Sequence, residues 1–306
     1  MTHRYEFEIF TASGGLTASG GLAARIFRDV DDLFTPRPTV VVTGSWLTVK
    51  EQMPDLYAGR LAEAGFTAVT FDFSGFGASV GEPHQAELPV RKIGEIAAVA
   101  QALSTASFVS GGVVGHLAVC ASAQYTLQAL RRPAPIAAFA SVAGWFHDAA
   151  TVAPMYGGAA GVAQRLERGQ AALAAFQQDG TVRTVPAYAE DDDQAGMSMP
   201  LPYYGDPKRG AIPAWRNEMA ELSWLYWLTF NGLTGARDVA TPALFVHSDG
   251  CVLPGNVRAV AAAMPSAELA WGEGSQIDFY DQPAQVGLAV AAAVRHFRAH
   301  LPDGPS

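Results

Sequence analysis

The sequence has few cysteines and few charged side chains. Cys120 and Cys251 are the two cysteines among 306 residues, which is too few for a disulfide framework. Charged residues make up 16% of the chain and hydrophobic residues 49%. This balance excludes a disordered chain and supplies enough apolar side chains for a large core. We therefore expect a compact folded protein.

Basic clusters and long apolar runs are also absent. The formal net charge is −9, and no patch of Lys and Arg would attract nucleic acid or an anionic membrane surface. No apolar run reaches the roughly 20 residues that a transmembrane helix needs, and residues 1–10 have no secretory signal pattern. We expect a cytoplasmic protein that binds a small-molecule substrate and neither nucleic acid nor membrane. A homodimer remains an open alternative.

Patterns for phosphate and metal binding are missing as well. No glycine-rich loop follows an apolar run at the spacing of a nucleotide site. No group of His, Cys and Asp residues has the spacing of metal ligands. We expect no cofactor and no metal.

The sequence does contain short apolar runs that alternate with longer helical patterns. This alternation is typical of parallel strands joined by crossover helices, and the first two runs, which precede any helix, predict an antiparallel lead-in. The sequence predicts an α/β fold with a mostly parallel eight-stranded sheet and helices on both faces. The predicted strands are residues 5–10, 22–27, 39–42, 67–71, 113–119, 136–142, 243–246 and 268–271, and the predicted helices are 50–64, 89–103, 121–131, 256–264 and 283–300.

The alternation stops between residues 149 and 239. This segment is helical at first and strongly aromatic near its end, which predicts an inserted helical lid between two core parts, residues 1–148 and 240–306. Trp224 and Trp227 belong to the aromatic part, and we expect them to bind an apolar substrate. The alternative for each ring is that it only packs the lid onto the core.

Cys120 lies alone between a predicted strand and a predicted helix. A tight strand-to-helix turn needs small residues two positions to either side, and Ala118 and Ser122 meet this need. At a helix N-terminus the free N–H groups favour a thiolate, so we expect a lowered pKa for Cys120. Cys120 is thus a candidate nucleophile. The alternative is a small buried cysteine with a structural role.

Two more segments extend this pattern. Residues 41–46, VVTGSW, and residues 71–79, FDFSGFGAS, precede the turn at Cys120. Together the three segments resemble the α/β-hydrolase superfamily, nearest to its dienelactone-hydrolase-like and acyl-peptidase-like branches, and the resemblance covers nearly the whole chain. It implies an α/β-hydrolase fold and an enzyme whose oxyanion hole uses the amides of Trp46 and Ala121. Ser45 is a candidate third donor, and Tyr125 is a candidate substrate contact.

The resemblance also implies positions for an acid and a base. Asp249 follows the predicted strand 243–246 and has the position of the acid. Gln276 stands where the superfamily has its histidine, and a glutamine cannot carry a proton at neutral pH. His147, just after the strand 136–142, is one alternative base. Asp278 and Asp249 are alternative carboxylates.

The missing histidine leaves three functions open. The leading hypothesis is a hydrolase, with the cysteine at the turn as nucleophile, that cleaves an ester, thioester or lactone of a small apolar metabolite of secondary metabolism. The second is a cofactor-free lyase, isomerase or cyclase that uses the oxyanion hole with Cys120, Asp249 or Asp278. The third is a binding protein without catalysis, because a fold does not determine a function.

Overall fold

Eight strands form the main sheet in a computed structural model that describes residues 3–10, 21–28 and 34–303. Within these residues eight strands pair in the order β1-β2-β4-β3-β5-β6-β9-β10. β1 and β2 are antiparallel, β2 pairs antiparallel with β4, and the other neighbours are parallel. The predicted sheet and its antiparallel lead-in are confirmed. The strands are β1 (His3–Phe10), β2 (Gly21–Arg28), β3 (Thr39–Thr43), β4 (Thr67–Phe71), β5 (Val114–Val119), β6 (Ile136–Val142), β9 (Ala243–Gly250) and β10 (Ala267–Ser275).

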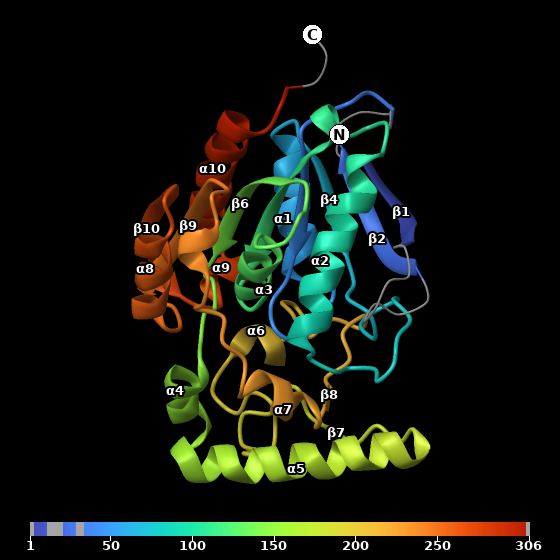
Figure 1. The fold of residues 1–306 in the computed structure, drawn as a ribbon, viewed down its shortest axis with the longest axis vertical. Coiled ribbons are helices and arrows are strands. Elements are labelled where there is room, and N and C mark those ends of the chain that lie inside the picture. Colours follow the sequence, from blue (N-terminus) through green and yellow to red (C-terminus); the bar gives the residue numbers. More distant parts are fainter. Residues whose placement is uncertain (1–2, 11–20, 29–33, 304–306) are drawn as a thin grey trace.

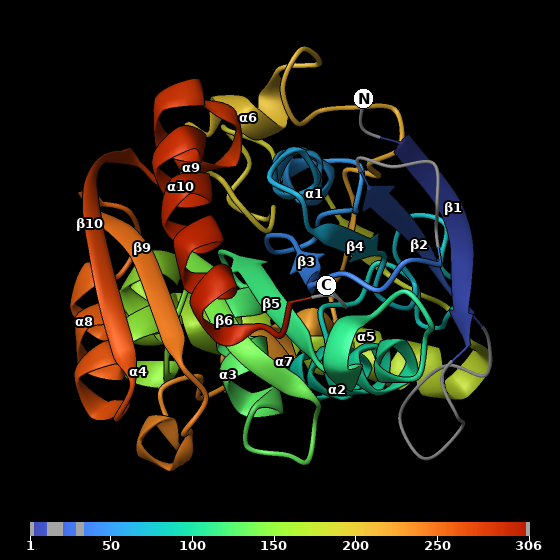
Figure 2. The ribbon, with the colours of Figure 1, turned by 90° about the horizontal axis from the view of Figure 1, so that it is seen from above.

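Helices cover both faces of the sheet (Figure 2). One face carries α1 and α10, which contact each other, and the other carries α2, α3 and α8. The central strands β3, β4 and β5 are buried along their whole length, as expected for parallel strands between two helical layers. Among the described residues no helix has the length and apolar character to cross a membrane. The bounds of these helices are α1 (Met53–Glu63), α2 (Pro89–Ser104), α3 (Ser122–Ala129), α8 (Pro254–Ala263) and α10 (Pro283–His300), and the short helix α9 (Asp278–Asp281) follows β10.

Residues 149–239 form an insertion between β6 and β9 that lies beyond one end of the sheet (Figure 1). The buried rings of Trp215, Trp224 and Trp227 belong to the same apolar cluster as side chains of the central strands. The insertion is therefore packed firmly on the core. That it opens and closes as a lid stays a prediction. It contains α4 (Ala149–Val152), α5 (Gly158–Asp179), β7 (Thr184–Val185), α6 (Pro202–Gly205), β8 (Met219–Ala220) and α7 (Ser223–Trp227).

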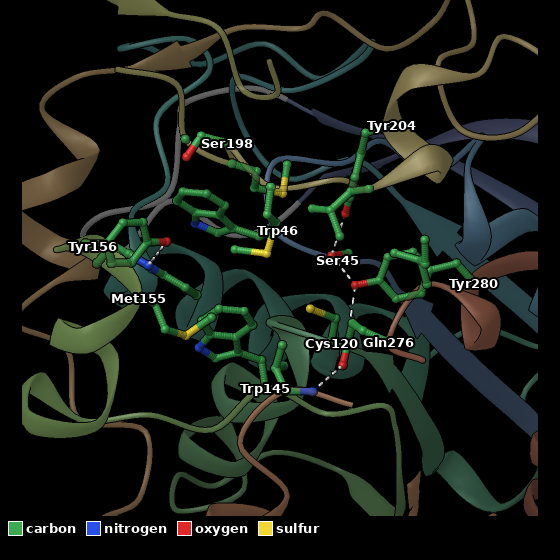
Figure 3. Close-up of a pocket in the computed structure, with 17 residues that line it drawn as sticks. Ser45, Trp46, Cys120, Trp145, Met155, Tyr156, Ser198, Tyr204, Gln276 and Tyr280 are labelled. Atoms are coloured by element: carbon green, nitrogen blue, oxygen red, sulfur yellow. Dashed lines mark hydrogen bonds between the residues drawn. The ribbon is translucent and has the colours of Figure 1, made fainter. Parts of the chain in front are cut away.

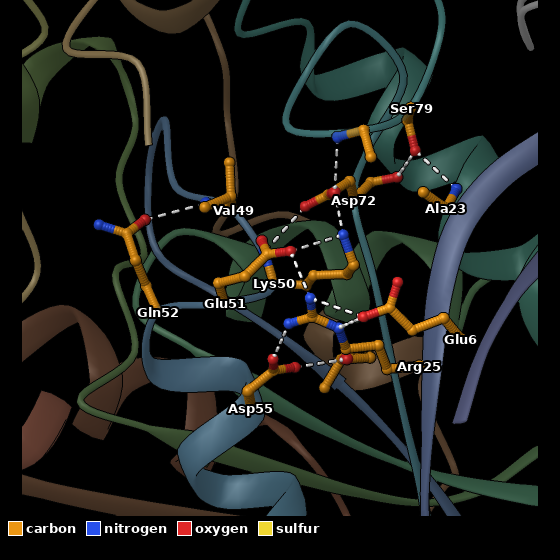
Figure 4. A network of polar contacts seen from close by, with 12 residues as sticks. Glu6, Ala23, Arg25, Val49, Lys50, Glu51, Gln52, Asp55, Asp72 and Ser79 are labelled. Carbon is orange, nitrogen blue, oxygen red and sulfur yellow. Dashed lines mark hydrogen bonds and ion pairs between the residues drawn. The ribbon is translucent and has the colours of Figure 1, made fainter. Parts of the chain in front are cut away.

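A buried ion pair joins the loops that follow β3 and β4 (Figure 4). The Lys50 ammonium lies 2.6 Å from a carboxylate oxygen of Asp72, and the Lys50 backbone N–H donates to the other oxygen at 2.8 Å. Both side chains are almost fully buried. A Cβ at Gly77 would collide with the Asp72 carboxylate, and the φ of Gly77 is +52°, so this turn requires glycine. The ion pair thus holds the loop that leads from β3 to the site.

We predict that Lys50→Met destabilises the protein by about 3–5 kcal/mol, because it leaves the Asp72 carboxylate buried without a counter-charge. The free energy of unfolding in urea measures this loss. Arg60→Met is the matched control, since Arg60 and Glu63 form an exposed pair that is worth at most about 1 kcal/mol. Equal small losses in both variants would contradict a structural role for the buried pair.

Candidate active site

Cys120 occupies a strained turn between β5 and α3. Its φ is +57°, and such a conformation costs a non-glycine residue about 1–3 kcal/mol. Three backbone hydrogen bonds hold it: the Cys120 N–H donates to Val142 O, and the Cys120 carbonyl accepts from Ala123 N and Trp145 N, each at 3.0 Å. The turn presents the thiol to a pocket (Figure 3). The predicted strand-turn-helix geometry is confirmed.

Other strained residues surround the same pocket. Leu47, Ala143 and Leu253 also have positive φ values, of 60°, 44° and 49°. Leu47 and Leu253 each follow a residue that lines the pocket, and the Ala143 carbonyl accepts a hydrogen bond from the pocket residue Gln276. Backbone strain collects at functional sites when the surrounding structure enforces it. The strain therefore marks this pocket as the candidate site.

The polar groups that interact with the Cys120 thiol are the backbone N–H groups of Trp46 and Ala121 and the hydroxyls of Ser45 and Tyr280. These interactions lower the pKa of the thiol, but its burial is the largest effect and raises the pKa of Cys120 above its ordinary value. The lowered pKa expected from the sequence is wrong, because the four donors do not offset the effect of burial.

A chain of hydroxyl groups runs beside the sulfur (Figure 3). Tyr204 donates to the Ser45 hydroxyl at 2.9 Å, and the Ser45 and Tyr280 oxygens lie 3.0 Å apart. Burial raises the pKa of both tyrosines. Sequence patterns predict neither tyrosine. Tyr280 follows Gln276 by four residues, a spacing that brings side chains together on a helical turn, whereas Tyr204 comes from the insertion without any recognisable signal.

Gln276 lies in the pocket with both ends of its amide held. Its Nε2 donates to Ala143 O at 2.7 Å and to the Tyr280 hydroxyl at 3.2 Å, and its Oε1 accepts from Val252 N at 3.1 Å. The group that faces Gln276 from the loop after β9 is therefore a backbone N–H and not a carboxylate. Gln276 acts here as a fixed hydrogen-bond donor.

His147 is a buried structural residue and not a base in the pocket. Its Nδ1 accepts from the Trp145 indole at 2.7 Å, and its Nε2 therefore carries the hydrogen and donates to Trp227 O at 2.9 Å. Burial lowers its pKa to about 4. Both nitrogens are occupied and His147 is not among the lining residues. The interpretation of His147 as the base is wrong.

The two predicted carboxylates also lie outside the pocket. β9 extends beyond the predicted end of the strand, so Asp249 lies within it, with its side chain 71% exposed and 2.7 Å from Arg258. Asp278 accepts hydrogen bonds from the backbone N–H and the hydroxyl of Ser275, each at 2.7 Å. Neither carboxylate lines the pocket with Cys120, so the structure does not support either as acid or base.

Tyr125 belongs to a buried charge cluster behind the site. Its hydroxyl donates to Glu87 at 2.7 Å, and Lys92 pairs with the same carboxylate at 2.7 Å. Glu87 also accepts a hydrogen bond from the backbone N–H of Leu47, the residue after Trp46, at 3.3 Å. Tyr125 is therefore not the substrate contact expected from the sequence, but part of the support for the loop at Trp46.

The pocket is mainly apolar and lies between the core and the insertion. Trp227 lines it and stacks on Trp46 with 4.8 Å between ring centroids. Trp224 is buried behind Trp46 and does not line it, so of the two predicted tryptophans only Trp227 faces the pocket. The apolar lining of the pocket includes Trp46, Trp145, Trp227, Met155, Met197 and Met199.

Among the described residues that line the pocket there is no Asp, Glu, His, Lys or Arg. The titratable groups on its wall are the Cys120 thiol and the phenols of Tyr156, Tyr204 and Tyr280. Burial raises the pKa of each of these groups. At neutral pH the pocket wall is therefore uncharged.

We predict that iodoacetamide alkylates Cys120 more slowly at pH 7 than it alkylates the same cysteine in the urea-unfolded chain, because burial raises the pKa of the thiol. The rate should still be rising above about pH 8.5, the ordinary thiol pKa. Cys251→Ala makes Cys120 the single cysteine for this measurement. A rate that levels off well below that pH would reveal a thiolate at neutral pH and contradict the raised pKa of Cys120.

We predict that His147→Gln leaves any turnover at Cys120 unchanged. We also expect the free energy of unfolding of this variant to depend less on pH between 4 and 6.5. The folded pKa of about 4 lies below the ordinary 6.5, so the unfolded chain binds more protons between these values. Stability is therefore full above about pH 6.5 and falls towards pH 4, by about 3 kcal/mol for this residue. Urea unfolding between pH 4 and 7.5 measures it. Loss of turnover in the stable variant would restore His147 as a candidate base.

No protein-family model matches the chain. Over 94 residues it is 40% identical to the uncharacterised protein YcjY of Escherichia coli, and over 96 residues it is 31% identical to the uncharacterised protein PA2218 of Pseudomonas aeruginosa. The matched segments cover 31% and 29% of this chain. They span less than a third of each relative, 31% of YcjY and 26% of PA2218.

Solved structures match nearly the whole chain. The crystal structure of PA2218 has a TM-score of 0.82 at 21% identity and covers 98% of this chain and 94% of its own. The α/β hydrolase GrgF from a Penicillium species has a TM-score of 0.77 at 20% identity and covers 98% of this chain and 99% of its own. At these identities the likeness shows the fold alone, and it confirms the fold that the sequence resemblance predicts.

Proposed function

We propose that this chain, which has the α/β-hydrolase fold, is an enzyme that forms an acyl-enzyme at Cys120 from an ester, thioester or lactone of a small apolar metabolite. The observation that carries the proposal is the strained turn, which holds the Cys120 sulfur beside the N–H groups of Trp46 and Ala121. Two convergent amides next to a nucleophile are the requirement for stabilising the oxyanion of an acyl transfer.

The chemistry follows from this arrangement. The Cys120 sulfur attacks the substrate carbonyl carbon, and the oxygen that gains negative charge is stabilised by the amides of Trp46 and Ala121. The S–C bond forms, the bond to the leaving oxygen or sulfur breaks, and the thiol proton leaves with that group. Water then cleaves the thioester, which yields a carboxylic acid and restores the thiol.

The pocket wall supports an apolar, uncharged acyl group. Aromatic rings and methionines form most of the wall, and methionine side chains adapt to ligands of irregular shape. A carboxylate or ammonium group on the acyl chain would lose its hydration without gaining a counter-charge from the described lining residues. The substrate class is therefore a neutral ester, thioester or lactone.

A second candidate is a cofactor-free reaction without water, such as a ring closure, an elimination or an isomerisation. It is favoured by the absence of an imidazole or a carboxylate among the described lining residues, since a water molecule that attacks a thioester needs a base. In a ring closure, a hydroxyl of the substrate would attack the thioester carbon. Its proton would return to the sulfur, and the product would be a lactone.

We predict that wild type and Cys251→Ala show the mass of one acyl group after incubation with p-nitrophenyl esters and an acid quench, whereas Cys120→Ala shows none. Intact-protein mass spectrometry makes the measurement. Product analysis separates the two candidates, because hydrolysis releases a free acid and ring closure does not. An ester and lactone panel that never labels the wild type would remove the acyl-enzyme proposal.

A further inference from the structure

We infer that Tyr280 and Ser45 carry the thiol proton of Cys120 to the leaving group, in place of a histidine, and that Gln276 positions Tyr280 for this transfer. The inference rests on the proposed function and deepens it. It names the groups that move the proton at the same site.

Three distant parts of the chain bring these groups together (Figure 3). Cys120 follows β5, Ser45 lies in the loop after β3, and Tyr280 lies in α9. All three side chains line the same pocket, and the hydroxyl oxygens of Ser45 and Tyr280 lie 3.0 Å from each other. Both hydroxyls also lower the pKa of the Cys120 thiol, so the sulfur and the two oxygens lie together at the pocket wall.

The hydrogen bonds around this group limit the directions in which its protons can point. The Gln276 Nε2 has no lone pair to offer, so the Tyr280 oxygen accepts its hydrogen bond and keeps its own O–H for Ser45 or Cys120. In the same way Tyr204 donates to Ser45, which leaves the Ser45 O–H free to donate. Each hydroxyl has one incoming donor and one outgoing hydrogen, as a proton relay requires.

Gln276 is a positioning residue in this arrangement. Its amide is held at one end by Val252 N and at the other by Ala143 O, so its remaining N–H has a fixed direction towards Tyr280. Since the glutamine cannot accept a proton from Tyr280 at Nε2, the Tyr280 hydrogen points away from Gln276, towards Ser45 and Cys120. A glutamine in place of a histidine therefore has a specific role here.

The transfer leaves every group neutral. As the S–C bond forms, the thiol proton passes to the Tyr280 oxygen, the Tyr280 proton passes to Ser45, and the Ser45 proton passes to the leaving oxygen as the C–O bond breaks. Each hydroxyl gains one proton and loses one. No phenolate or thiolate has to persist, which suits a buried wall without a counter-charge.

The test compares Tyr280→Phe with wild type in single-turnover acylation. The substrates are esters of one acyl group whose leaving alcohols range from p-nitrophenol to simple alkanols. An alkoxide must be protonated as it leaves, whereas p-nitrophenolate leaves as an anion. Tyr280→Phe should slow alkyl esters by about 100-fold or more and p-nitrophenyl esters by less than about 10-fold. Ser45→Ala should likewise slow the acylation by alkyl esters more than the acylation by p-nitrophenyl esters.

Tyr203→Phe is the matched control. Tyr203 is also buried, its ring lies 5.1 Å from that of Tyr280, and it does not line the pocket. This variant should change no ester by more than about twofold. If Tyr280→Phe slows all esters equally, or slows none, the relay is wrong. Should that variant not fold, Ser45→Ala decides the question by the same criterion.

The two proposals fail in different ways. If wild type forms no acyl-enzyme at Cys120 with any ester, the proposed function is wrong and the relay falls with it. If wild type is acylated but the leaving-group dependence of Tyr280→Phe and Ser45→Ala matches that of wild type, only the relay is wrong.

Discussion

The turn at Cys120 is the constraint to which the rest of the site is fitted. A positive φ at a cysteine is unfavourable, and it persists because β5 is buried along its whole length between β3 and β6. The strand ends where the Cys120 N–H still reaches Val142 O, and α3 starts two residues later. The chain between these two fixed elements has one short path, and that path turns the thiol towards the insertion.

Charged groups support this turn from a distance and stay out of the pocket. The Lys50–Asp72 pair ties the loops after β3 and β4 together, and Glu87 accepts the N–H of Leu47 beside Trp46. Buried charges need partners, and here each has its partner behind the pocket wall. The consequence is a neutral, apolar pocket, and this environment is also what raises the pKa of Cys120.

Local sequence patterns could predict the strands and the turn at Cys120, because each depends on residues that are close in the chain. They could not predict where the side chains of His147, Asp249 and Tyr125 point. His147 is held by Trp227 O and Tyr125 by Glu87, partners from distant segments, and Asp249 faces solvent because β9 is longer than its apolar run. Tyr204 reaches the site from an insertion whose path has no periodic signal.

The environment of the pocket favours the proposed relay over an imidazole beside Cys120. His147 is packed between Trp145 and Trp227, two residues of the pocket wall, and burial there lowers its pKa to about 4. A histidine beside the sulfur would meet the same lack of water and of a counter-charge, so it would hold a proton poorly at neutral pH. Hydroxyl groups accept one proton while they release another and need not become charged. In an apolar pocket with a protonated thiol, we therefore expect Tyr280 and Ser45 to be better suited to proton transfer than a histidine at the position of Gln276.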